Sequence, residues 1–124
     1  MASRSASLRA PSSISARPAV ACGTNTCSRP TPPTAGLALI ELGARSDTDL
    51  LAILAELLPA DDRWRHAHGS RGHGRSHVLP AFVPPYATIP VLGGRLALGT
   101  WQSVALVDLN VDNPDRQVRL SFLG

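Results

Sequence analysis

Residues 34–59 read TAGLALIELGARSDTDLLAILAELLP and carry the main structural signals of the chain. The stretch begins with the apolar run GLALI, which is typical of a buried strand and ends at Glu41. A helix is expected next, because Ser46 can serve as N-cap with Asp49 three residues later, near the positive end of the helix dipole. Pro59 would end this helix. The apolar face that would pack on a sheet comprises Leu50, Ile53, Leu54, Leu57 and Leu58.

Downstream of the helix and a polar loop, the sequence predicts β-structure. The two best strands are 101–109 and 117–123, and the second alternates apolar with polar side chains. The loop 110–115 contains Asn-Pro and is expected to join them as an antiparallel pair. Shorter apolar segments of β-type lie at 78–83, 86–91 and 95–98. The predicted class is therefore α+β, with a mixed and mostly antiparallel sheet and one main amphipathic helix.

The first 33 residues differ in composition from the rest of the chain. They are dominated by Ser, Ala, Arg and Pro and lack apolar periodicity, so residues 1–33 are predicted to be a disordered arm before a single domain at 34–124. The formal charge of +3 comes from this end: residues 1–40 hold four arginines and no acid, whereas the remainder holds eight arginines and nine carboxylates. Because the domain is nearly neutral, a nucleic-acid partner is not expected.

A membrane partner is not expected either. No apolar run approaches the roughly 20 residues that a membrane-spanning helix needs. The first 33 residues also lack the continuous apolar stretch of a secretory signal. We therefore expect a cytoplasmic protein.

The polar loop at residues 60–77 is a candidate functional segment, because connections of this length are often functional. Imidazoles titrate near neutrality and bind divalent metals, so a metal or acid–base site is one interpretation of its histidines. A solvated loop rich in Gly and Arg is the other, and spacing by itself does not choose between them. The loop holds all four histidines of the chain: His66, His68, His73 and His77.

Residues 89–102, IPVLGGRLALGTWQ, carry a resemblance to a known family. They resemble the signature of the YjbQ family, small α+β proteins whose pattern reads roughly V/I-P-x-x-x-G-R-L-x-L-G-T-W-Q. Upstream, Thr34-Ala35-Gly36 followed by Glu41 is similar to the family's H-x-T-A…E block. Arg65-His66 and His77 fall where the family has its R-H and A-H-[LI] elements. The resemblance covers about residues 34–123.

This resemblance implies a homotrimer with sites near its subunit interfaces. It also implies secondary thiamine phosphate synthase activity, which joins a pyrimidine pyrophosphate to a thiazole phosphate and releases pyrophosphate. The departing pyrophosphate requires positive charge, which a divalent metal ion or an arginine can supply. The expected ligands are therefore a small phosphorylated molecule and a divalent metal ion.

The resemblance further implies a set of site residues. His66 and His77 are the expected catalytic histidines and the expected contacts to metal or phosphate. Glu41 and Asp49 are the carboxylates expected to support catalysis, although helix capping also explains Asp49. No family counterpart is clear for the other two histidines, which we interpret as loop residues. The residues expected to bind substrate are Arg95, Trp101 and Gln102.

Two of these substrate-binding residues have an alternative explanation. Arg95 can hold an anion, or it can pair with a carboxylate beside the Gly-Gly turn. Trp101 can line a pocket, but a tryptophan at the start of a strand is more often part of the core.

Pro32 stands where the family's H-x-T-A block has its histidine. Proline offers neither a metal ligand nor a proton shuttle, which favours a second function class: a non-catalytic oligomeric protein that binds a metal or an anion. Codons for residues 26–32, read in a shifted frame, can encode Val-Leu-Ala-Pro-His-Ala and restore that histidine. We therefore hypothesise that residues 1–33 come from a shifted reading frame, which the nucleotide sequence would test.

Overall fold

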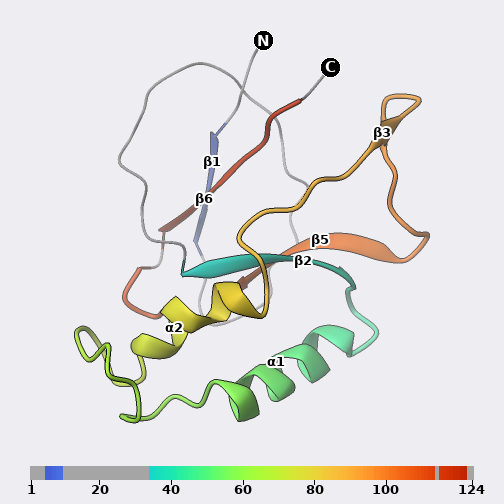
Figure 1. Cartoon of the computed structure of the whole chain (residues 1–124). Helices are drawn as coiled ribbons and strands as arrows, with labels where there is room; N and C mark the ends of the chain where they lie inside the picture. Colours follow the sequence, from blue (N-terminus) through green and yellow to red (C-terminus); the bar gives the residue numbers. More distant parts are fainter. Residues whose placement is uncertain (1–4, 10–33, 114, 123–124) are drawn as a thin grey trace.

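The computed structural model describes residues 5–9, 34–113 and 115–122 (Figure 1). These residues form two α-helices and three two-stranded antiparallel sheets, which confirms the predicted α+β class. No helix among them is long and apolar enough to cross a membrane.

The central element is an antiparallel ladder of strands β2 (Ala35–Glu41) and β5 (Gln102–Asp108). Ala35 lies opposite Asp108 at one end of the ladder, and Glu41 lies opposite Gln102 at the other. Six residue steps of about 3.3 Å separate the two ends, which are therefore about 20 Å apart. Both strands were predicted from the sequence, and their opposite ends prove to have different surroundings.

Helix α1 (Ser46–Leu57) covers this ladder (Figure 1), as predicted. Its start differs from the prediction: Arg45 is the N-cap, with φ of 71°, and no side chain caps the helix. The carbonyl oxygen of Arg45 accepts the N–H of Asp49 at 2.9 Å, which is the first hydrogen bond of the helix. Ser46 is therefore already inside the helix, and its predicted role as N-cap is wrong. The core comprises Leu54, Leu58, Leu79, Val83, Val107 and Leu109.

The segment at residues 78–83 is helical, so its assignment as β-structure was wrong. It contains the end of helix α2 (Gly74–Val78) and the 3-10 turn η1 (Leu79–Ala81). A short apolar run fits a buried helical turn as well as it fits a strand, and the first turn of a helix tolerates a proline. Leu79 is fully buried and anchors the turn in the core.

A small hairpin extends from the body of the molecule (Figure 1). Strands β3 (Val91–Leu92) and β4 (Arg95–Leu96) pair across the predicted Gly93-Gly94 turn. The β-structure expected at 86–91 and 95–98 is therefore limited to two residues on each side of the turn.

The last two strands do not pair with each other, contrary to the sequence-based prediction. Strand β6 (Asp115–Arg119) pairs with β1 (Ser5–Arg9), while β5 pairs with β2. The Arg116 guanidinium on β6 binds the Asp108 carboxylate at the end of β5, with distances of 2.5 and 2.8 Å. β1 lies in the segment predicted to be a disordered arm, and residues 10–33 of that segment, including Pro32, lie outside the described residues.

Candidate metal centre

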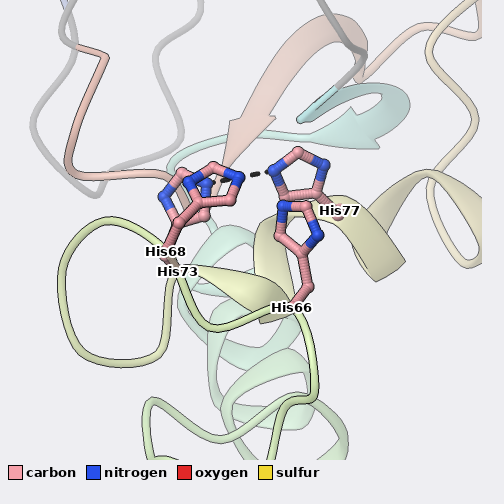
Figure 2. Close-up of side chains that lie close together, drawn as sticks. All are labelled: His66, His68, His73 and His77. Carbon is pink, nitrogen blue, oxygen red and sulfur yellow. Dashed lines mark hydrogen bonds between the residues drawn. The ribbon is translucent and has the colours of Figure 1, made fainter.

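The four histidines converge beside α2 (Figure 2). One ligand nitrogen from each lies within 4.8 Å of those of the other three. His73 and His77 are four residues apart at α2, which puts them on one face of the helix, with their Nε2 atoms 3.0 Å apart. His66 and His68 approach from the preceding loop, and the ring centroids of His66 and His77 are 4.1 Å apart.

Two glycines allow the loop to fold back on itself. Gly69 has φ of 78°, and a Cβ there would lie 2.5 Å from Asp112 Oδ2 and 2.8 Å from His73 Nδ1. At Gly74, a Cβ would lie 2.7 Å from the carbonyl oxygen of His66. The absence of side chains at these two positions therefore permits the close approach of the histidines.

Asp112 connects the histidine loop to the segment that follows β5. Its Oδ2 lies 2.5 Å from His73 Nδ1 and accepts the backbone N–H of Ser70 at 3.0 Å, and its Oδ1 accepts the Ser70 hydroxyl. These contacts, the Ser70 hydroxyl first and His73 after the Ser70 amide, lower the pKa of Asp112 to about 2. The carboxylate is therefore ionised near neutral pH and acts as an acceptor.

This contact assigns the tautomer of His73. An ionised carboxylate can only accept, so His73 Nδ1 carries the proton, and in the neutral imidazole the lone pair is then on Nε2. That lone pair faces His77 and the rest of the cluster. The His73 side chain is only 9% exposed, which restricts its orientation.

Burial favours the neutral form of His77. Desolvation is the main cause that lowers its pKa from 6.5, and the neighbouring imidazoles His66, His73 and His68 add to the effect. A metal binds the unprotonated nitrogen of a neutral imidazole, so the lowered pKa favours His77 as a ligand near neutral pH.

An open pocket of about 320 Å³ lies against the cluster. His66 and His68 are exposed in this pocket, so a small molecule can reach the cluster from solvent. Arg71 also lines the pocket, where its Nε lies 3.2 Å from Asp62 Oδ2. Both side chains of this ion pair are exposed, so the pair is weak and the guanidinium can move toward an anionic ligand.

The structure brings some of the predicted site residues together and leaves the others apart. His66 and His77 lie in one cluster, and His68 and His73, which were interpreted as loop residues, lie in the same cluster. Sequence reasoning did not single out Asp112, because nothing in the loop after β5 points to a histidine 39 residues earlier.

The other predicted site residues lie apart from the histidines. Glu41 and Gln102 are opposite each other at the far end of the β2–β5 ladder. Asp49 is exposed in the first turn of α1, which follows that same end of β2. Arg95 is exposed on the β3–β4 hairpin, and Trp101 is 72% exposed rather than in the core. Within one chain these five residues and the histidines do not form a single site.

A family model described as "UPF0047 protein YjbQ-like" matches residues 26–124. The chain belongs to this YjbQ-like family. A UPF0047 protein of Mycobacterium tuberculosis is 67% identical over 90 residues, covering 73% of this chain and 68% of its own length. The fold is shared with a hypothetical protein of Aeropyrum pernix, with a TM-score of 0.65 and 32% identity over 74% of this chain and 67% of the other.

A second solved relative is a YjbQ-like protein of unknown function from Sulfolobus solfataricus. It has a TM-score of 0.63 and 25% identity, over 70% of this chain and 62% of its own. The family assignment made from the GRLALGTWQ segment is thus confirmed.

Proposed function

We propose that the four histidines of this YjbQ-like protein bind one divalent transition-metal ion, with Zn²⁺ as the best candidate. The observation that carries the proposal is the convergence of four imidazole nitrogens within 4.8 Å of one another. Imidazole donors suit zinc, copper and nickel, whereas magnesium and calcium prefer oxygen. The chemistry of the donor set therefore fits a zinc-type ion.

The spacing of the ligands fits such an ion as well. Zinc–nitrogen bonds of about 2.1 Å in a tetrahedron place the nitrogens about 3.4 Å apart. The Nε2 atoms of His73 and His77 are already 3.0 Å apart, so small side-chain rotations suffice. In the metal-free protein one of these two nitrogens must donate to the other, and His73 Nε2 has the lone pair. His77 must therefore release its Nε2 proton, or transfer it to Nδ1, when this nitrogen becomes a ligand.

The finer proposal is an enzyme of the secondary thiamine phosphate synthase type, acting on a small phosphorylated molecule. A bound divalent ion would supply Lewis-acid stabilisation of a departing pyrophosphate. Arg71 supports this proposal, because its weakly paired guanidinium lies in the open pocket beside His66 and His68 and can bind phosphate oxygens. The pocket admits a small molecule from solvent, so the substrate can reach the cluster directly.

The alternative is a non-catalytic protein that binds a metal or an anion. Its support is the separation of Glu41 and Asp49 from the cluster, since neither carboxylate can act on a ligand held by the histidines of the same chain. A homotrimer could bring such residues to a neighbouring chain's cluster, and this assembly also stays a proposal. Light scattering on the purified full chain tests for it.

Metal titration tests the metal proposal. The full-length protein, stripped with a chelator, is titrated with Zn²⁺ against a chromophoric competitor, and we expect one ion per chain. Cobalt substitution should give the intense visible absorption of a tetrahedral site. His66→Ala and His77→Ala should each lower the affinity strongly, whereas Glu56→Gln on the exposed side of α1 should not. Absence of zinc binding by the folded wild-type chain would refute the proposal.

Thiamine phosphate formation tests the enzyme proposal. The zinc-loaded wild type and its Pro32→His variant are assayed with the pyrimidine pyrophosphate and the thiazole phosphate. Product from either would support the enzyme class, and Arg71→Ala should then raise KM more than it lowers kcat. Metal binding without product from either version would favour the non-catalytic alternative.

A further inference from the structure

We propose that Asp112 is a positioning residue of the histidine cluster, which holds His73 in the tautomer that presents its Nε2 lone pair to a metal ion. The inference deepens the metal proposal and rests on it for its functional consequence. Its structural part, the fixed tautomer, belongs to the metal-free protein and can be measured there.

The contacts of Asp112 divide between two tasks. Oδ2 lies 2.5 Å from His73 Nδ1 and so holds the imidazole through this nitrogen. Oδ1 accepts the Ser70 hydroxyl, and Oδ2 also accepts the Ser70 N–H at 3.0 Å, which clips the loop to the same carboxylate. Because the two carboxylate oxygens share one rigid plane, the position of the loop and the direction of the His73 ring are set together.

A chain of hydrogen bonds ties Asp112 to the end of the β2–β5 ladder. The N–H of Asp112 donates to Asn110 Oδ1 at 2.9 Å, and the N–H of Asn110 donates to Asp108 Oδ1 at 2.9 Å. Asp108 is 3% exposed and is bound by the Arg116 guanidinium. Asp112 therefore takes its position from the buried ladder rather than from the loop that it holds.

The carboxylate also acts on the basicity of His73. A negative charge behind the Nδ1–H raises the electron density that Nε2 offers to a metal, and it disfavours the tautomer in which Nε2 carries the proton. Loss of such an outer partner typically weakens metal binding about 10- to 100-fold. We expect a loss in this range for Asp112→Ala.

Three variants distinguish the orientation of His73 by Asp112 from the effect of Asp112 on the loop at Ser70. Asp112→Asn keeps an oxygen that can accept from His73 Nδ1–H but removes the charge, so it should retain the tautomer and lose less affinity than Asp112→Ala. Ser70→Ala removes the hydroxyl contact of the loop with Asp112 Oδ1 but leaves the Ser70 N–H and the His73 contact in place. Asp62→Asn removes a carboxylate that pairs with Arg71 in the same pocket, and it is the matched control for charge.

Two readouts are measured on the full chain. Long-range proton–nitrogen NMR of the metal-free protein reports which His73 nitrogen carries the proton, at a pH near 7.5. Wild type, Asp112→Asn, Ser70→Ala and Asp62→Asn should show Nδ1–H, whereas Asp112→Ala should shift toward Nε2–H. Competition titration with Zn²⁺ should show the 10- to 100-fold loss in Asp112→Ala and less than a threefold change in Asp62→Asn.

The outcomes distinguish this inference from the metal proposal. An unchanged His73 tautomer in a folded Asp112→Ala variant would overturn the inference, and so would equal affinity losses in Asp112→Ala and Asp62→Asn. If the wild type binds no metal, the metal proposal fails, while the tautomer measurement still decides whether Asp112 positions His73. Asp112→Ala is checked for folding by circular dichroism. If it does not fold, Asp112→Asn is compared with Asp62→Asn: the inference expects a larger loss of zinc affinity in Asp112→Asn, and equal affinities would overturn it.

Discussion

Replacing Gly69 with alanine should both destabilise the fold and weaken metal binding. Gly69 has φ of 78°, a conformation that costs a residue with a Cβ about 1–2 kcal/mol. The new Cβ would also lie 2.5 Å from Asp112 Oδ2 and 2.8 Å from His73 Nδ1, closer than real Cβ atoms come to other groups. One of these two side chains must move, which breaks the contact that orients His73.

Gly43→Ala is the matched control for this substitution. Gly43 has φ of 84°, but a Cβ there finds open space, so the variant has the backbone cost alone. Urea unfolding of the metal-free proteins should therefore show a loss of about 1–2 kcal/mol for Gly43→Ala and a larger loss for Gly69→Ala. Zinc affinity should fall about tenfold or more in Gly69→Ala and stay unchanged in Gly43→Ala. Equal unfolding losses together with unchanged zinc affinity would refute this reasoning.

Three further predictions concern the core, the buried ion pair and pH. Leu79→Ala removes a fully buried side chain and should lower the free energy of unfolding by about 2–5 kcal/mol in a urea titration, a result that an effect below 1 kcal/mol would contradict. Arg116→Ala leaves the buried Asp108 carboxylate without its cation and should cost about 3–5 kcal/mol, whereas Arg95→Ala on the exposed hairpin should have little effect. The lowered pKa of His77 means that the unfolded chain binds a proton at this histidine more readily than the folded chain does. The contribution of His77 to the free energy of unfolding should therefore be complete above pH 6.5 and be lost as the pH falls below it. Zinc affinity, measured by competition, should fall over the same pH range.

Local patterns predicted the strand, the helix and their packing, because these depend on residues that are close in the chain. The apolar spacing of Leu54 and Leu58 indicated the buried face of α1, and both residues are in the core. Ile53 and Leu57 show the same spacing but are about half exposed, since the pattern does not say how wide the covered face is. The N-cap was mispredicted because the backbone at Arg45 turns before the favourable Ser46 side chain is reached.

Strand pairing was not predictable from the same kind of pattern. The loop between β5 and β6 suggested a hairpin, but Asp108 and Asn110 each accept a backbone N–H two residues further on and redirect the chain. The partner of β6 is β1, more than a hundred residues away in sequence. Alternation of apolar and polar residues shows which face of a strand is covered, but it does not name the neighbouring strand.

The sequence by itself determined the family, through the GRLALGTWQ segment, and the concentration of every histidine in one polar loop. It did not determine that the four imidazoles face one another, because this requires Gly69 and Gly74 to bring the loop back onto α2. It also gave no sign of Asp112, whose contact with His73 spans 39 residues. Such a contact exists only once the β2–β5 ladder has placed the loop after β5 beside the histidines, since chemistry between residues distant in sequence depends on the packing that joins them.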